Sequence, residues 1–276
     1  MNDIEVKKVI RRAIEEDIGT GDITTDNIIE KDEKGKGVIA VKERAVVAGL
    51  DVAKFVFKEI DSEVKFERIK DDGEEVKKGD KIALVQGKIG SILKGERLAL
   101  NFLQRMSGIA TKTRRYVDKV KDYDVRVTDT RKTTPTLRFF EKRAVSLGGG
   151  HNHRMGLYDA VLIKDNHIRA VGTIGEAIKG VREKIPHTTK IEVEVESIEG
   201  VKEALESEAD IIMLDNMSFE KMKESVKLIG NSAISEASGG ITLENIEEVA
   251  KTGVDVISVG ALTHQIKSTD IGLDVK

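Results

Sequence analysis

The chain has 276 residues, of which 39% are hydrophobic, and its 46 basic and 49 acidic side chains leave a formal net charge of −3. This balance provides no overall electrostatic attraction for nucleic acid or an anionic membrane, and the absence of cysteine excludes disulfides and thiolate metal sites. The acid-rich N-terminus lacks the apolar core of a secretory signal, and no apolar run reaches the roughly 18 residues of a membrane span. We therefore expect a cytoplasmic protein without a nucleic-acid or membrane partner.

The first hundred residues have the pattern of a mixed α+β unit. Apolar side chains at helical spacing predict a helix over 3–16, which ends at the glycine-containing segment "GTGDITT". A strand over 37–48, a helix over 50–60 and short hairpin-forming strands within 64–93 follow. A long helix is expected over about 95–120, where apolar residues keep one stripe that is loosened at a Ser-Gly pair.

Beyond this helix, strand-like and helix-like runs alternate. From the third strand on, the strand starts are about 20 residues apart, which is typical of βα units around a parallel sheet. Six units are visible, and this favours an incomplete, open α/β barrel over a closed eight-stranded one, with a doubly wound open sheet as the alternative. The six predicted strands are 124–128, 160–164, 190–195, 209–214, 233–237 and 254–259.

Polar residues or glycines follow each predicted strand or end it. Because parallel strands place their carboxyl ends on one face, where ligands bind in such folds, we expect these residues to converge on a single rim. They are Arg131 and Lys132, Lys164, Glu194, Asp215, the run Ser238-Gly239-Gly240, and Gly260.

The expected rim has a positive part and a phosphate-binding part. Seven basic residues and three histidines lie between Asp129 and His167 against four acids, which suits an anionic ligand with carboxylates or phosphates. Later carboxylates suit sugar hydroxyls or Mg²⁺, and the glycine pair before Thr242, a predicted helix N-cap, can offer backbone N–H groups to a phosphate. The basic residues are Arg131, Lys132, Arg138, Lys142, Arg143, Arg154 and Lys164; the histidines are His151, His153 and His167.

Each of these features also has a purely structural explanation. The first two basic residues of the rim can be solvated loop charges, and the alternation in "EVEVE" also fits an ordinary half-exposed strand. Asp215 can cap a turn, and the glycine pair can form one. The segment "HNH" could suggest a metal pair, but no cysteine or carboxylate stands at ligand spacing nearby. It is the joint placement on one rim that favours function.

Taken together, several segments resemble the quinolinate phosphoribosyltransferase family, also called carboxylating nicotinate-nucleotide pyrophosphorylases. The resemblance begins at "EDIGTGDITT" and continues in order to the C-terminus, and "TRKTTP" and "NHR…KDNH" are its most specific parts. The other segments that carry it are "GERLALNFLQRMSGIAT", "DTRKTTPTLRFFEKRAV", "GGGHNHR", "VLIKDNH", "IEVEVES", "IIMLDNM", "EASGGI" and "ISVGALTH".

The resemblance implies a fold, a reaction and an assembly. The fold is an α/β protein with an open-faced α+β sandwich at 1–105, rejoined by the tail 266–276, and an incomplete α/β barrel at 106–265. The reaction transfers phosphoribose from phosphoribosyl pyrophosphate to quinolinate with decarboxylation, which gives nicotinate mononucleotide for NAD biosynthesis and requires Mg²⁺. The assembly is a homodimer with shared active sites, alone or within a hexamer of dimers.

The resemblance also implies residue roles. Arg131, His153, Arg154 and Lys164 would bind the quinolinate carboxylates, and Arg97 would reach into the neighbouring subunit's site. Lys132 would bind phosphate or pyrophosphate oxygens. Glu194 and Asp215 would face the ribose and Mg²⁺, directly or through water. The 5′-phosphate would lie against Ser238, Gly239, Gly240 and Gly260. The implied catalytic set is Lys132, Lys164, Glu194 and Asp215.

Three rival hypotheses remain at this point. A relative acting on nicotinate would need fewer cations, because its substrate lacks the second carboxylate. A biotinyl-type carrier module is suggested by "VKKGDKIALVQGKIGSI", but the modifiable lysine at a hairpin tip is missing. A noncatalytic phosphate-binding barrel would leave the positive part of the rim without a use.

Overall fold

The computed structural model describes residues 4–276 and divides the chain into two compact units. The first unit comprises residues up to 114 together with 133–149 and 265–276, and the second comprises 115–132 and 150–264. The boundary predicted at 105/106 therefore falls within the first unit, and residues 133–149, predicted to belong to the barrel, also belong to the first unit. In the described part of the chain, no helix has the length and hydrophobicity needed to cross a bilayer.

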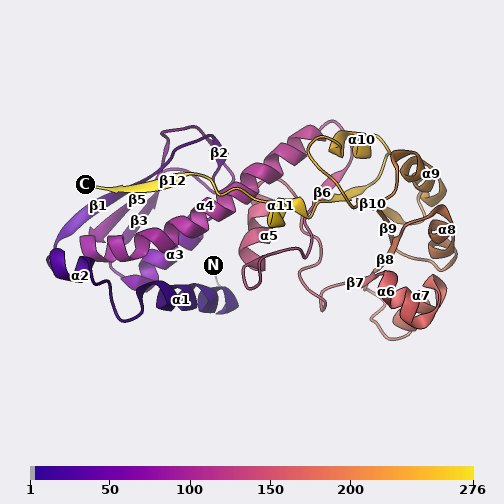
Figure 1. Cartoon of the computed structure of the whole chain (residues 1–276), viewed down its shortest axis with the longest axis horizontal. Coiled ribbons are helices and arrows are strands. Elements are labelled where there is room, and N and C mark those ends of the chain that lie inside the picture. Colours follow the sequence, from indigo (N-terminus) through magenta and orange to yellow (C-terminus); the bar gives the residue numbers. More distant parts are fainter. Residues whose placement is uncertain (1–3) are drawn as a thin grey trace. The chain divides into compact units, whose positions relative to one another are not determined.

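The first unit is built on a four-stranded antiparallel sheet with the order β12-β1-β5-β3. The C-terminal strand β12 pairs with β1, so segments from opposite ends of the sequence lie side by side in one sheet (Figure 1). Helix α3 packs against β3, and α1 packs against α3. The elements are α1 Ile4–Ile18, α2 Thr25–Ile28, β1 Lys34–Val41, β2 Ala45–Val46, α3 Leu50–Ile60, β3 Lys65–Arg68, β4 Glu75–Val76, β5 Lys81–Lys88, α4 Ile89–Lys119, α5 Arg138–Leu147 and β12 Ile271–Val275.

Helix α4 differs from its prediction at two places. It begins at Ile89, within the segment expected to be strand, and it continues without interruption through Ser107 and Gly108. A Cβ atom on Gly108 would lie 2.3 Å from the carbonyl oxygen of Lys267, and the Ser107 hydroxyl accepts a hydrogen bond from the Ala48 amide at 3.0 Å. The Ser-Gly pair therefore serves close packing of the C-terminal segment and does not weaken the helix.

A buried ion pair joins α4 to α5 in the first unit. Glu141 is completely buried, and its carboxylate accepts a hydrogen bond from Arg105 Nε at 2.9 Å. We expect Arg105→Ala to destabilise this unit by roughly 3–5 kcal/mol, because it leaves an uncompensated buried carboxylate. Removing the exposed Arg11–Glu59 pair should cost about 1 kcal/mol or less. Urea unfolding of Arg105→Ala and Arg11→Ala checks this, and equal midpoints would contradict it.

The second unit contains six parallel strands in the order β6-β11-β10-β9-β8-β7. From β7 to β11 each strand pairs with the next one in the sequence, and β6 pairs with β11. Within residues 4–276 no ladder joins β6 to β7, so the barrel stays open, and the predicted open α/β fold with six parallel strands is confirmed. The strands are β6 Arg126–Thr128, β7 Val161–Ile163, β8 Ile191–Val195, β9 Ile211–Asp215, β10 Ile234–Ser238 and β11 Val256–Ser258.

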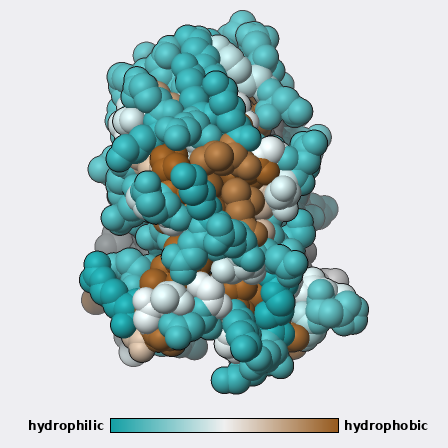
Figure 2. All heavy atoms as spheres, turned by 90° about the vertical axis from the view of Figure 1, so that its right-hand side faces the viewer, coloured by the Kyte–Doolittle hydropathy of each residue, from teal (hydrophilic) through white to brown (hydrophobic). Residues whose placement is uncertain are grey.

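Helices connect successive strands of this unit and cover the sheet. Hydroxyl caps begin three of them: Thr173, Ser197 and Ser218 each accept a hydrogen bond from the amide three residues later. The apolar stripes of these helices face the sheet, and their outer face is largely hydrophilic with a smaller hydrophobic area (Figure 2). The helices are α6 Asp165–Val171, α7 Ile174–Arg182, α8 Ile198–Glu206, α9 Phe219–Ile229, α10 Ile246–Ala250 and α11 Ala261–His264.

Candidate functional site

The carboxyl ends of the first two strands in the β7-to-β11 order are linked by an ion pair. Lys164 follows β7, and its ammonium group contacts the carboxylate of Glu194 on β8. The Lys164 side chain is 43% exposed, whereas that of Glu194 is 14% exposed. Lys164 also precedes α6, where its amide donates to the Nδ1 atom of His167 at 2.9 Å. Glu194 therefore fixes the Lys164 ammonium group in position before an anionic ligand binds.

Two arginines form the positive part of the rim. Burial lowers the pKa of Arg154, and the positive charge of Arg131 lowers it further, while the negative charge of Glu192 raises it. Arg154 Nη1 donates to the carbonyl oxygen of Ala160 at 2.9 Å. Like charges that repel in this way favour a bound anion, because it removes the repulsion and accepts hydrogen bonds from both groups.

The "HNHR" segment is held by a carboxylate that sequence reasoning did not assign. Asp129, directly after β6, is completely buried and accepts hydrogen bonds from the His153 amide at 2.9 Å and from Asn152 Nδ2 at 2.6 Å. His151 forms a parallel bridge with Thr128, so the chain extends the open edge of the sheet at β6. Asp129 is the first residue of "DTRK" and directly follows a predicted strand, so its position could have indicated a role at the strand end.

Lys132 and Gly260 meet where β6 and β11 end. A Cβ atom on Gly260 would lie 3.0 Å from Lys132 Cδ, so the lysine stem passes over the glycine. The Thr263 hydroxyl donates to the carbonyl oxygen of Lys132 at 2.7 Å and fixes this segment. A side chain at this position would require the lysine stem to shift.

The ends of β9 and β10 are joined at the glycine pair. Ser238 is in register with Asp215, and the Asn216 amide donates to the Ser238 carbonyl at 3.0 Å. Gly239 has a φ of +91°, and a Cβ atom there would lie 2.3 Å from Asn216 Oδ1, so glycine is the residue this close approach permits.

One predicted feature of the glycine loop is wrong. Thr242 does not cap the next helix, because α10 begins at Ile246 and has Asn245 at its N-cap. The Thr242 amide instead donates to Asn245 Oδ1 at 2.8 Å within the turn. Any phosphate held by Gly239 and Gly240 would thus meet loop amides, without the first turn of a helix.

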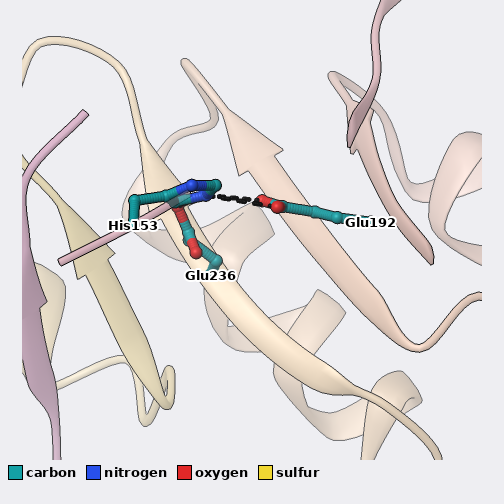
Figure 3. A group of neighbouring side chains, drawn as sticks. All are labelled: His153, Glu192 and Glu236. Atoms are coloured by element: carbon teal, nitrogen blue, oxygen red, sulfur yellow. Dashed lines mark hydrogen bonds and ion pairs between the residues drawn. The ribbon is translucent and has the colours of Figure 1, made fainter. Parts of the chain in front are cut away.

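A cluster of three buried groups lies behind these residues. His153 Nε2 lies 3.2 Å from Glu192 Oε2 and 3.6 Å from Glu236 Oε1, and the two glutamates come from β8 and β10 (Figure 3). Burial raises the pKa of Glu236 to about 7, and the neighbouring negative charge of Glu192 adds to the shift. Sequence reasoning left "EVEVE" open between a functional strand and an ordinary half-exposed one, and it gave neither Glu192 nor Glu236 a role.

Four of the basic residues considered above lie in the first unit. Arg97 is exposed on α4. Arg138, Lys142 and Arg143 belong to α5, where Lys142 is completely buried and Arg143 pairs with Asp51 at 2.8 Å. Arg131, Lys132, Arg154 and Lys164 belong to the second unit, where Lys164 contacts Glu194 and the Lys132 stem lies against Gly260.

Comparison with known proteins divides the chain near residue 108, close to the predicted boundary at 105/106. The family profile described as "Quinolinate phosphoribosyl transferase, C-terminal domain" matches residues 109–274, and that of the N-terminal domain matches 22–107. Together they cover nearly the whole chain. The chain belongs to the quinolinate phosphoribosyltransferase family.

Individual relatives of this quinolinate phosphoribosyltransferase family member match over almost their full length. Proteins named "Probable nicotinate-nucleotide pyrophosphorylase (carboxylating)" from Bacillus subtilis and Methanocaldococcus jannaschii are 45% and 47% identical to it. These matches cover 100% and 97% of this chain, and 95% and 96% of the relatives. The solved structure of the nicotinate-nucleotide pyrophosphorylase from Francisella tularensis is 38% identical in sequence and has a TM-score of 0.94. The match covers 99% of this chain and 96% of the Francisella chain.

Proposed function

We propose that this chain transfers phosphoribose from phosphoribosyl pyrophosphate to quinolinate, with loss of one carboxylate as CO₂, as part of NAD biosynthesis. The observation that supports this most directly is that one rim combines a cluster of cations with carboxylates and glycines at neighbouring strand ends. Quinolinate is a dianion and the co-substrate a polyanion, so the cations of the rim offset the repulsion between the two. Family membership supplies the reaction, and the rim provides a physical reason for it.

We assign the dicarboxylate to the positive part of the rim. Arg131 and Arg154 each offer a guanidinium fork, and Lys164 offers an ammonium group. His153 accepts the Arg154 amide through Nδ1 and faces Glu192 through Nε2, so it would act by holding Arg154. Bound there, the ring nitrogen of quinolinate would point toward the ribose. Such alignment converts a bimolecular step into a nearly unimolecular one.

The phosphoribosyl group would occupy the part formed by β8 to β11. Attack of the pyridine nitrogen on C1 breaks the C1–O bond, and pyrophosphate leaves with the electron pair. Glu194 and Asp215 then face the developing positive charge on the ribose, while Ser238, Gly239, Gly240 and Gly260 lie where the 5′-phosphate would bind. Lys132, which passes over Gly260, would contact phosphate or pyrophosphate oxygens.

Mg²⁺ is part of this proposal. Glu194 and Asp215 come from adjacent strands, and Mg²⁺ binds to proteins through one or two carboxylates together with substrate phosphates. The donor set therefore fits, through direct bonds or through water. When bound with phosphoribosyl pyrophosphate, the ion would neutralise the departing pyrophosphate.

Decarboxylation follows from the new positive charge on the ring. The bond between C2 and its carboxylate breaks, CO₂ leaves, and the electron pair stays on C2 beside the pyridinium nitrogen. A proton then converts C2 to C–H and yields nicotinate mononucleotide. The cations of the rim would stabilise this electron-rich carbon until it is protonated.

We also propose that the enzyme acts in the cytoplasm as a homodimer with shared active sites, alone or within a hexamer of dimers. Arg97 would complete the partner's quinolinate site, because a single rim supplies fewer cations than a dianion and a polyanion require. Size-exclusion chromatography with light scattering should give at least twice the 30.4 kDa mass of the chain. A monomer at assay concentration would contradict the shared site.

The reaction is tested with quinolinate labelled in its 2-carboxylate. With phosphoribosyl pyrophosphate and Mg²⁺, labelled CO₂ and nicotinate mononucleotide should appear in equal amounts. Nicotinate, which lacks the second carboxylate, should react at least about tenfold more slowly in kcat/KM, because part of the cation cluster would remain unpaired. Equal use of nicotinate, or no turnover of either base, would contradict the proposed function.

A further inference from the structure

His153 is held between two carboxylates that come from strands separated by β9. Its side chain is 13% exposed, while those of Glu192 and Glu236 are 4% and 5% exposed. Figure 3 shows both carboxylates directed at the imidazole, and the closer contact joins Nε2 to Glu192. The three side chains belong to the second unit and are mostly buried.

The other ring nitrogen determines where the imidazole carries its proton. His153 Nδ1 accepts the backbone N–H of Arg154 at 2.7 Å, so Nδ1 is unprotonated and the proton of the ring lies on Nε2, facing the carboxylates. A histidine that binds a metal through Nε2 instead donates a proton from Nδ1 to a neighbouring acceptor. The three side chains could reach one ion by distance alone, but this tautomer and the nearby cations oppose it.

Two ionised carboxylates would not be compensated by one neutral imidazole. Glu236 Oε1 is buried and has no hydrogen-bond partner among residues 4–276. The charged or titratable groups facing Glu236 are Glu192 on β8, His153, and Lys164 after β7, while Ser258 on β11 offers a hydroxyl. Burial and repulsion by Glu192 raise the pKa of Glu236 to about 7, so the neutral acid is populated near neutral pH.

We propose that Glu192 and Glu236 are positioning residues for the quinolinate site, which hold His153 and through it the backbone of Arg154, and that Glu236 does so as a neutral carboxylic acid. This inference rests on the proposed function, because it gives the cluster a role in binding the dicarboxylate. It explains why two acids lie buried beneath a site for an anion: one negative charge is balanced by the surrounding cations, and a second would repel the substrate.

The direction of the pH effect follows from this assignment. Below about pH 7 Glu236 is protonated, and kcat/KM for quinolinate has its full value. Above that pH Glu236 ionises, the cluster gains a negative charge, and kcat/KM falls, mainly through KM, because a dianion is repelled. Glu236→Gln cannot ionise and should lose this alkaline decline while it keeps activity near pH 6 within about threefold of wild type.

The experiment measures kcat and KM for quinolinate from about pH 5.5 to 9 at saturating phosphoribosyl pyrophosphate and Mg²⁺. Glu236→Ala should raise KM at least about tenfold at every pH, because it removes the buried group without a replacement. Glu248→Gln, an exposed acid on α10, is the matched control and should keep the wild-type profile. Thermal unfolding identifies any variant that has simply failed to fold.

A second readout does not depend on turnover. ¹⁵N NMR of histidine-labelled protein, assigned with His153→Gln, should show His153 with its proton on Nε2, and this state should persist in Glu236→Gln. Three results would overturn the inference: a fall in kcat/KM of Glu236→Gln at alkaline pH as large as that of the wild type, a proton on Nδ1 of His153, or stoichiometric zinc on the purified protein. If quinolinate is not turned over while the NMR result holds, the proposed function fails and the tautomer assignment stands.

Discussion

Replacing Arg131 with alanine should reduce kcat/KM for quinolinate by about 30- to 5,000-fold. This corresponds to roughly 2–5 kcal/mol, the range for removing one member of a desolvated charge pair. The positive charges of Arg131 and Arg154 act on each other, so a bound carboxylate would be attracted by two guanidinium groups, and loss of one leaves the other to bind alone. Steady-state kinetics with quinolinate as the varied substrate measure the effect.

Two further variants separate charge and geometry from general damage. Arg131→Lys keeps the charge and loses the planar fork, so it should recover only part of the activity. Arg126→Ala removes an exposed arginine at the start of β6, the strand that precedes Arg131, and should behave like wild type. Near-normal turnover of Arg131→Ala would remove this residue from the proposed site.

Mixing two inactive variants should restore activity. Arg97→Ala would lose the cation that completes the partner's site, and Lys164→Ala would lose the ammonium group beside Glu194. In a mixed dimer one site would carry both substitutions and the other would carry neither. After subunit exchange at equal amounts, roughly half of the molecules should be mixed dimers, each with one intact site, which gives about a quarter of wild-type activity.

The complementation needs its own controls. Subunit exchange is verified with tagged chains by co-purification, and mixing Arg97→Ala with itself should restore nothing. Persistent inactivity of verified mixed dimers would contradict a shared site. Full activity of Arg97→Ala alone would contradict the role assigned to this exposed side chain.

The parallel sheet could be predicted because its signal is local. Strand segments such as Ile211–Asp215 are short, mostly apolar runs separated by amphipathic helices, and this spacing predicts βα units without knowledge of distant contacts. The rim could be predicted for the same reason, since parallel strands end on one face. Lys164 beside Glu194 and Lys132 over Gly260 are consequences of that topology.

The features that escaped prediction depend on long-range packing. An ordinary half-exposed strand would leave Glu192 partly in solvent, but Glu192 is buried and faces His153 from a distant segment. Lys142 follows a polar pattern in the sequence, yet it is completely buried in the first unit. Thr242 has the composition of a helix cap, but the turn closed by Asn245 delays the helix by several residues.

The most direct test is a crystal structure of the enzyme with quinolinate, an unreactive analogue of phosphoribosyl pyrophosphate, and Mg²⁺. The account predicts the two quinolinate carboxylates against Arg131, Arg154 and Lys164, and the 5′-phosphate against Gly239, Gly240 and Gly260. Quinolinate bound away from these cations, or a phosphate held elsewhere in the barrel, would contradict it.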